Sequence, residues 1–478
     1  MTSARRLPAG AWAAAGGVVA LLLAVGSRYG FHRDEMYFVA AGRRLDWGYV
    51  DQPPLVPAIA RGVEEITGAV SPWTLRVAPA LAVGAVALIA ALAARRFGAG
   101  KAGQVYAAFA LGWAGVVVGE GHLLSTAIFD FLFWAVSLAL VAALLDGADP
   151  RLWLVLGATV GVGLQNKHTI GIMAVAMFVG LVASRRDVLR SAWPWTGVAL
   201  AAALALPNLV WQAVHGWPQL EMARALADRS EGPLAFVVFQ PLLLSVATTV
   251  PAIAGLWWLV RAAEARPWRP LAVMYGFLFV FFLATGGKAY YIAPVYAVLV
   301  PAGARWFEQL GTAARRWLVA VTAAGLAIGL VIALPLVPVD MVANVDLTGE
   351  LGETVGWPEL IDQIAAVQVD ALTGAVVFTA SYGEAGAVEL LGPAAGLPPA
   401  WSGHNSYWSW GPPPTHGAVI GVGHVAPVLA SICADVEQVA TISNPYGVEN
   451  EEAGLPIYLC DRPFRQLSVV WDRARHYN

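Results

Sequence analysis

The chain has 478 residues, of which 58% are hydrophobic and 13% are charged, and its mean hydropathy is +0.63. Soluble proteins carry about 25% charged residues, so this composition excludes an ordinary soluble domain and indicates a polytopic α-helical membrane protein. The net charge is -3, and the sequence contains no basic stripe. This argues against nucleic acid as a partner.

The charges are unevenly distributed along the chain. Residues 1–338 contain 25 Lys and Arg and 16 Asp and Glu, whereas residues 339–478 contain 4 and 16. Such asymmetry separates a membrane part from a soluble part. We therefore expect a transmembrane domain over 1–338 and a small soluble domain over 339–478.

Hydrophobic segments predict about eleven transmembrane helices, at about 20 apolar residues per crossing. We expect them at residues 9–27, 74–94, 102–119, 123–145, 152–166, 169–184, 193–213, 234–260, 270–286, 289–306 and 317–338. The first is interpreted as an uncleaved helix, because no small-residue cleavage site follows it. Lys and Arg cluster on alternate connections, which places those connections in the cytoplasm. The first outer loop (28–72) and the tail then share the extracytoplasmic face of the plasma membrane.

A run of acids and bases, His32-Arg33-Asp34-Glu35-Met36-Tyr37, directly follows the first predicted helix. A charge in hydrocarbon costs about 2.5–3.5 kcal/mol on insertion scales, so such residues usually bind or react with something. Later in the same loop, residues 54–68 have apolar side chains at helical spacing. We expect a short helix there, lying in the membrane interface.

The sequence pattern differs in the tail, where short β-rich runs at 375–379 and 418–422 alternate with helix-like stretches at 357–367 and 426–433. This alternation predicts a small α/β domain. A polar, aromatic loop that includes His404 and Asn405 separates the two strands and is suited to stacking on sugar rings. Cys433 and Cys460 are the two cysteines of the chain, and they form either one disulfide in an oxidising compartment or two buried thiols.

Ionisable residues near the ends of the predicted helices gather on the outer side of the predicted topology. They are the acids Asp34, Glu35 and Asp130, the bases Lys167 and Lys288, and His122 before the fourth helix. Lysine binds phosphate as a compact point charge, and a carboxylate can take a proton from an attacking hydroxyl. We expect one outward-opening cavity for a substrate that is part lipid and part phosphate.

Two other functions use similar residues. A membrane transporter also places charges in its helices, but it typically shows internal repeats, and none is visible here. Another polyprenyl-lipid-processing enzyme, such as a lipid phosphatase or ligase, could use the lysines without needing the acid pair after the first helix.

Five sequence motifs resemble glycosyltransferase family 39, the membrane-embedded GT-C enzymes that include protein O-mannosyltransferases and bacterial aminoarabinose transferases. The motifs are Asp34-Glu35-Met36-Tyr37-Phe38, Gly48-Tyr49-Val50-Asp51-Gln52-Pro53-Pro54, Gly121-His122 through Asp130, Gly163-Leu164-Gln165-Asn166-Lys167-His168-Thr169, and Gly286-Gly287-Lys288-Ala289-Tyr290-Tyr291. His168 stands where related transferases often have glycine. The resemblance implies inverting transfer of a hexose or pentose from a polyprenyl-phosphate carrier to a hydroxyl of a cell-envelope glycan, lipid or protein.

The resemblance also implies roles for individual residues. Asp34 would activate the acceptor hydroxyl with support from Glu35, or would bind a divalent cation such as Mg²⁺ or Mn²⁺ together with the second acid, Asp130. Lys167 and Lys288, with His122, would hold the donor phosphate. The expected acceptor or sugar contacts are Tyr37, Asp51, Gln52, Tyr290, Tyr291, His404 and Asn405. No organic cofactor is expected.

Overall fold

The computed structural model describes residues 6–227, 232–367, 375–413 and 417–477, and the chain forms two compact units. The helical unit comprises Met1–Gly26, Arg76–Val214 and Ala227–Leu336. The mixed unit comprises Ser27–Leu75, His215–Leu226 and Val337–Asn478. The first outer loop thus packs in the same unit as the tail, although residues 76–336 separate them in sequence.

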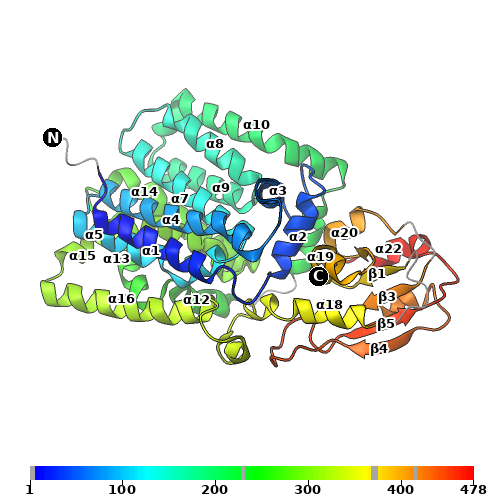
Figure 1. The fold of residues 1–478 in the computed structure, drawn as a ribbon. Coiled ribbons are helices and arrows are strands. Elements are labelled where there is room, and N and C mark those ends of the chain that lie inside the picture. The colour runs from blue at the N-terminus through cyan, green and yellow to red at the C-terminus, as the bar shows by residue number, and fades with distance from the viewer. Residues whose placement is uncertain (1–5, 228–231, 368–374, 414–416, 478) are drawn as a thin grey trace. The chain divides into compact units, whose positions relative to one another are not determined.

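The helical unit consists of α-helices with a few 3-10 turns (Figure 1). Its elements are α1 (Ala9–Val25), α4 (Pro72–Arg96), α5 (Lys101–Gly112), α6 (Gly115–Gly121), α7 (Thr126–Leu145), α8 (Leu152–Leu164), α9 (Thr169–Ser184), η2 (Val188–Arg190), α10 (Ala192–Val214), α12 (Pro233–Leu244), α13 (Val246–Arg261), η3 (Arg266–Trp268), α14 (Arg269–Thr285), η4 (Ala289–Val295), α15 (Tyr296–Gln309) and α16 (Thr312–Ala333). All eleven predicted ranges therefore fall on helices.

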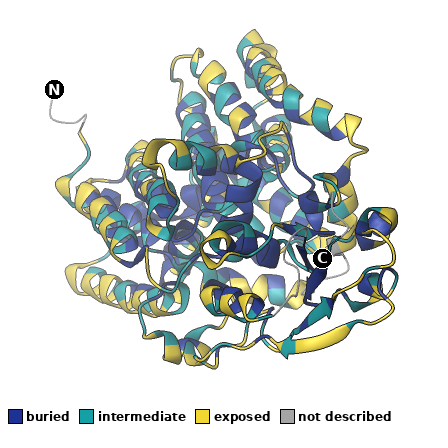
Figure 2. Ribbon diagram, turned by 45° about the vertical axis from the view of Figure 1, so that its right-hand side comes forward, coloured by how far each residue is buried: buried dark blue, intermediate teal, exposed yellow. Residues whose placement is uncertain are grey.

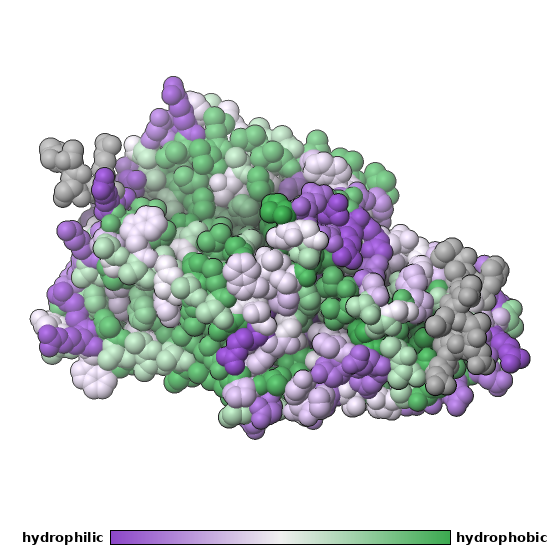
Figure 3. All heavy atoms as spheres, viewed as in Figure 1, coloured by the Kyte–Doolittle hydropathy of each residue, from purple (hydrophilic) through white to green (hydrophobic). Residues whose placement is uncertain are grey.

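Five helices in the described part of the chain are long and apolar enough to cross a membrane, or up to seven if each of two bent pairs is one crossing. Three shorter apolar helices, α1, α8 and α9, add to these. The chain is thus a helical membrane protein with several apolar helices, while the count of eleven crossings stays a prediction. The surface of the helical unit is largely hydrophobic on the face that Figure 3 shows.

Two ranges predicted as single helices are broken in the structure. Residues 102–119 form α5 and α6 with a bend of 55°, and residues 234–260 form α12 and α13 with a bend of 102°. At the second break Ser245 has a φ of +88°, which ends α12, and its hydroxyl accepts the N–H of Thr248 to cap α13. Hydropathy does not reveal such a break, because the segments on both sides of it are apolar.

Small residues bring the helices of this unit into backbone contact. A Cβ on Gly303 of α15 would lie 1.8 Å from the carbonyl oxygen of Pro251 in α13, and one on Gly197 of α10 would lie 2.4 Å from that of Trp153 in α8. Such close approach is typical of helix packing in membranes. The long apolar helices differ in how much of an 18-residue apolar stretch is buried, from 67% in α7 to 11% in α16 (Figure 2). Helix α7 therefore lies at the centre of this unit and α16 at its surface.

The mixed unit contains short helices and one five-stranded sheet. Its elements are α2 (Arg33–Gly42), α3 (Leu55–Thr67), α11 (Pro218–Ala227), η5 (Val339–Met341), α17 (Val342–Val345), η6 (Gly352–Thr354), α18 (Trp357–Ala365), β1 (Val376–Thr379), α19 (Tyr382–Leu391), η7 (Gly392–Ala395), β2 (Ala400–Ser402), α20 (Asn405–Ser409), β3 (Val419–Val422), α21 (Ala426–Leu429), β4 (Glu437–Thr441), β5 (Pro456–Cys460), η8 (Leu467–Val470) and α22 (Trp471–Ala474). The predicted strands coincide with β1 and β3, and the predicted helix at 54–68 coincides with α3.

The sheet has the strand order β2-β1-β3-β5-β4. Strand β1 pairs in parallel with β2 and β3, whereas β5 pairs antiparallel with β3 and β4. One side of the sheet buries Phe378, Leu429 and Trp471 in a core that also contains both cysteines. Cys433 and Cys460 are joined as a disulfide that closes a separation of 27 residues.

Candidate functional site

The acidic stretch predicted as a loop is the first turn of helix α2, which corrects that prediction. The His32 side chain accepts the N–H of Asp34 at 3.2 Å, and the Glu35 carboxylate accepts the N–H of His32 at 2.9 Å. This reciprocal arrangement is a capping box, in which two backbone N–H groups at a helix start find partners. Glu35 is fully buried in this role, so it supports Asp34 by fixing the helix start.

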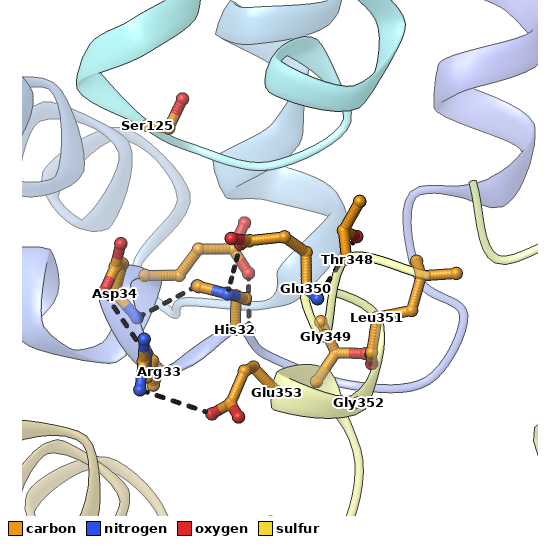
Figure 4. Close-up of polar contacts among 12 residues, drawn as sticks. His32, Arg33, Asp34, Ser125, Thr348, Gly349, Glu350, Leu351, Gly352 and Glu353 are labelled. Carbon is orange, nitrogen blue, oxygen red and sulfur yellow. Dashed lines mark hydrogen bonds and ion pairs between the residues drawn. The ribbon is translucent and has the colours of Figure 1, made fainter. Parts of the chain in front are cut away.

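Arg33 joins α2 to the tail. Its guanidinium forms ion pairs with Glu451 and, at 3.6 Å, with the buried Glu353. Burial raises the pKa of Glu353, while Arg33 opposes that rise. Figure 4 shows the Arg33 side chain turned toward Glu353 and the His32 ring turned toward Glu350, 3.4 Å away. These ion pairs connect the start of α2 to a segment more than 300 residues later.

Asp34 has one engaged and one unengaged carboxylate oxygen. Its Oδ1 accepts a hydrogen bond of 2.7 Å from the Tyr382 hydroxyl and lies 4.0 Å from Nε of Arg33. Within the described residues, Oδ2 has no hydrogen-bond partner, and the side chain is 39% exposed. Asp34 can therefore accept a proton without losing a structural bond.

A second carboxylate lies beside an aromatic cluster in the same unit. Tyr37 donates to Oδ1 of Asp51 at 2.7 Å, and its ring lies 4.9 Å from that of Tyr382 and 6.0 Å from that of Tyr407. Burial raises the pKa of Asp51 to about 7, although Tyr37 opposes the shift. Asp51 thus changes charge near neutral pH.

The remaining predicted contacts of the mixed unit are buried. Nδ1 of His404 accepts the N–H of Tyr382 at 3.3 Å, and its ring stacks on His476 at 4.7 Å. Gln52 and Asn405 are 4% and 1% exposed, and among the described residues Nε2 of Gln52 and Oδ1 of Asn405 have no hydrogen-bond partner. All three lie in the interior, and His404 also contacts the ring of Tyr382.

In the helical unit, Lys167 lies in the turn between α8 and α9. Its ammonium group lies 5.4 Å from the ring centroid of Tyr290 and 5.3 Å from that of Tyr291, both in η4. Such cation–π contacts attract the ammonium without neutralising its charge. Lys288 directly precedes η4 and is exposed. The structure thus brings Lys167, Tyr290 and Tyr291 together, with Lys288 at the start of the same segment.

Asp130 is buried beside the same turn. Its two oxygens accept hydrogen bonds from the Thr169 hydroxyl at 2.7 Å and from the Trp134 indole at 3.1 Å. The helix predicted to start at residue 123 starts at Thr126, so Asp130 lies about one turn inside it. Asp130 therefore fixes Thr169, two residues beyond Lys167.

His122 ends helix α6, and its Nδ1 lies 2.7 Å from the carbonyl oxygen of Gly119. No group of three or more His, Cys, Asp or Glu among the described residues is arranged to hold a metal ion. The cation site expected at Asp34 and Asp130 stays a prediction, because the two acids lie in different units. Asp34 lies in the mixed unit, whereas Asp130, Lys167 and Lys288 lie in the helical unit, so the single cavity expected from the sequence stays a prediction.

The partners of these residues were not predicted from the sequence. Arg33, Glu353 and Glu451 form the ion pairs of α2, Tyr382 binds Asp34, and Thr169 binds Asp130. The Thr169 contact had a local signal, because it lies in the same motif as Lys167. The contacts with the tail had none, since only folding brings residues 300 apart together.

Residues 51–211 match the family model described as dolichyl-phosphate-mannose-protein mannosyltransferase. The lipid A galacturonosyltransferase RgtD of Rhizobium johnstonii is 28% identical over 214 residues, which are 42% of this chain and 42% of the relative. The match therefore spans less than half of that protein.

Solved structures show the same fold over nearly the whole chain. ArnT from Cupriavidus metallidurans in the apo state superposes with a TM-score of 0.64 at 15% identity, over 93% of this chain and 96% of ArnT. Its complex with undecaprenyl phosphate superposes with a TM-score of 0.62 at 16% identity, over 93% of this chain and 97% of ArnT. The mycobacterial arabinofuranosyltransferase AftD superposes with a TM-score of 0.53 at 15% identity, over 94% of this chain and 41% of AftD. Together these findings confirm the resemblance to GT-C glycosyltransferases.

Proposed function

We propose that this chain, which has the GT-C fold of ArnT, transfers a sugar from a polyprenyl-phosphate carrier to an acceptor hydroxyl. The observation that carries the proposal is the state of Asp34, whose Oδ1 is held by Tyr382 while Oδ2 has no partner among the described residues. A carboxylate held in this way is suited to general-base catalysis. We place the reaction on the extracytoplasmic face of the plasma membrane.

The proposed reaction is a single inverting displacement. Asp34 takes the proton of the acceptor hydroxyl as that oxygen forms a bond to the anomeric carbon. The bond between the anomeric carbon and the phosphate oxygen breaks, and its electron pair leaves with the polyprenyl phosphate. Glu35 and Arg33 keep the base in place by fixing the start of α2.

Lys167 is the proposed ligand of the donor phosphate. Its ammonium group rests on two tyrosine rings. Within the described chain it forms no direct ion pair, although the Asp130 carboxylate interacts with it electrostatically over a longer distance, and we propose that it also binds an anion. Lys288, at the start of η4, and His122 would assist it. Asp130 acts indirectly, because it fixes the turn that carries Lys167 through Thr169.

The matching proteins suggest which sugars to test. Their names specify mannose, galacturonic acid and arabinofuranose, and each becomes a candidate for this chain. The acceptor is proposed as a hydroxyl of a cell-envelope glycan, lipid or protein, with Tyr37, Asp51, Tyr290 and Tyr291 as the contact residues. A divalent cation such as Mg²⁺ or Mn²⁺ bound by Asp34 stays a second proposed role for that acid.

A transfer assay with the purified chain tests the proposal. Undecaprenyl phosphate carrying labelled mannose, galacturonic acid or arabinofuranose is incubated with the protein and with cell-envelope extract, and lipids that co-purify with the protein are identified by mass spectrometry. We expect one donor to be consumed, with release of undecaprenyl phosphate and a labelled acceptor of inverted anomeric configuration. Consumption of none of the donors, with no polyprenyl lipid co-purifying, would refute the proposal.

A further inference from the structure

Tyr382 is a tail residue whose hydroxyl contacts the proposed catalytic base. It donates to Oδ1 of Asp34 at 2.7 Å across a separation of 348 residues. Both residues belong to the mixed unit and both begin a helix, Asp34 in α2 and Tyr382 in α19. The soluble tail thus reaches the first turn of α2 at the one residue assigned to proton transfer.

The Tyr382 side chain is held from several sides. Its N–H donates to Nδ1 of His404 at 3.3 Å, and its ring lies 4.9 Å from the rings of both His404 and Tyr37. The Arg33 guanidinium lies 6.0 Å from the ring centroid. A ring confined by these neighbours keeps its hydroxyl directed at the carboxylate.

Helices α2 and α19 also approach closely enough to fix this contact. A Cβ on Gly383 would lie 2.9 Å from Cβ of Arg33, and a Cβ on Gly386 would lie 3.0 Å from Cβ of Met36. The two glycines therefore let α19 lie against α2, with Tyr382 at the near end. A capping box between Ser381 and Glu384 fixes the start of α19, as His32 and Glu35 fix the start of α2.

We propose that Tyr382 is a positioning residue for catalysis, holding Oδ1 of Asp34 so that Oδ2 faces the acceptor hydroxyl. This inference rests on the proposed function and adds that the tail takes part in the chemistry. A hydrogen bond to one oxygen fixes the rotation of the carboxylate and therefore the direction of its other oxygen. The charged and titratable groups around the contact are Arg33, Asp51 and His404.

The variant Tyr382→Phe removes the hydroxyl and keeps the ring. We expect kcat to fall by about 10-fold to 100-fold, the range for a hydrogen bond to a charged group, with KM for the undecaprenyl-phosphate donor within about twofold. A purely structural role of Tyr382 would instead change kcat and KM together.

Tyr446→Phe is the matched control, because the Tyr446 hydroxyl also donates to a tail carboxylate, that of Glu359, at 3.1 Å. It should leave kcat unchanged. Amide hydrogen exchange in α19 shows whether Tyr382→Phe folds normally, and Tyr382→Gln, which restores a donor on a shorter side chain, should recover part of kcat if Tyr382→Phe unfolds α19.

Asp34→Asn separates the two hypotheses. If Asp34→Asn keeps its activity, the proposed base is wrong. If Asp34→Asn is inactive while Tyr382→Phe retains the wild-type kcat, the base stands and the role of Tyr382 is refuted.

Discussion

Arg33 in the mixed unit and Lys167 in the helical unit are both cations beside tyrosine rings, but their other partners differ. Arg33 pairs with Glu353 and Glu451 and lies 6.0 Å from the Tyr382 ring centroid. Lys167 lies 5.4 Å and 5.3 Å from two ring centroids and, within the described residues, forms no ion pair with a carboxylate. Arg33 is thus paired directly with carboxylates, whereas Lys167 contacts rings and feels the Asp130 carboxylate only at longer range, which leaves its ammonium group without a direct anionic contact.

The same contrast applies to the acids. Glu35, Glu353 and Glu384 are buried and serve in caps or ion pairs. Asp34 is 39% exposed and leaves one oxygen without a partner among the described residues. The charged groups of this chain thus separate into those that build the mixed unit and those available to a substrate, and variants of each kind should behave differently.

The largest effect is expected for Asp34→Asn. This change keeps the size of the side chain and removes its ability to take a proton, so transfer should fall by about 10²-fold to 10⁴-fold. The rate of undecaprenyl phosphate release measures it. Asp46→Asn, an exposed neighbour in the same loop, serves as control. A wild-type rate for Asp34→Asn would place Asp34 with the structural acids.

The second prediction concerns Glu384, whose burial raises its pKa to about 8. The unfolded carboxyl titrates near 4.5, so the folded state binds more protons between about pH 4.5 and 8, and stability falls as the pH rises through that window. Glu384→Gln should remove roughly 2–4 kcal/mol of this pH dependence in α19. Amide hydrogen exchange at several pH values measures it.

Glu437→Gln, an exposed change on β4, should leave the slope of stability against pH as it is in the wild type. If the slope of stability against pH is the same in Glu384→Gln as in the wild type, Glu384 is ionised in the folded protein, and its pKa is not raised.

A smaller loss is expected for Arg33→Gln. Removing the guanidinium leaves Glu353 buried without its cation, which should lower the opening free energy of α2 by about 1–3 kcal/mol. Arg462→Gln is the control, because Arg462 is 93% exposed in its ion pair with Asp461 and should change stability by less than about 0.5 kcal/mol. Equal exchange rates in the two variants would show that Arg33 is not a structural cation.

Much of the fold was predictable because its signals are local. Apolar segments mark the helices of the helical unit, and the spacing of apolar side chains marks α3. Helix α2 also had a local signal in the spacing of His32 and Glu35, but His is not among the usual capping residues. The break at Ser245 was not predictable, since hydropathy does not report a positive φ.

The acids and lysines of the proposed site could be selected from the sequence, because ionisable groups next to apolar segments are conspicuous. Their hydrogen-bond and ion-pair partners could not. The contacts of Asp34 with Tyr382 and of Arg33 with Glu353 join segments more than 300 residues apart, and no periodicity of the chain encodes such pairing. The sequence could therefore propose candidate reactive groups, but not the groups that orient them.

The central claim is that Lys167 holds the donor and Asp34 activates the acceptor, and a titration with undecaprenyl phosphate tests it most directly. Lys167→Ala should raise Kd by about 10-fold to 100-fold, whereas Asp34→Asn and the exposed control Lys101→Ala should stay within about twofold of the wild type. The reverse pattern, with Lys167→Ala binding normally and Asp34→Asn losing affinity, would contradict the account.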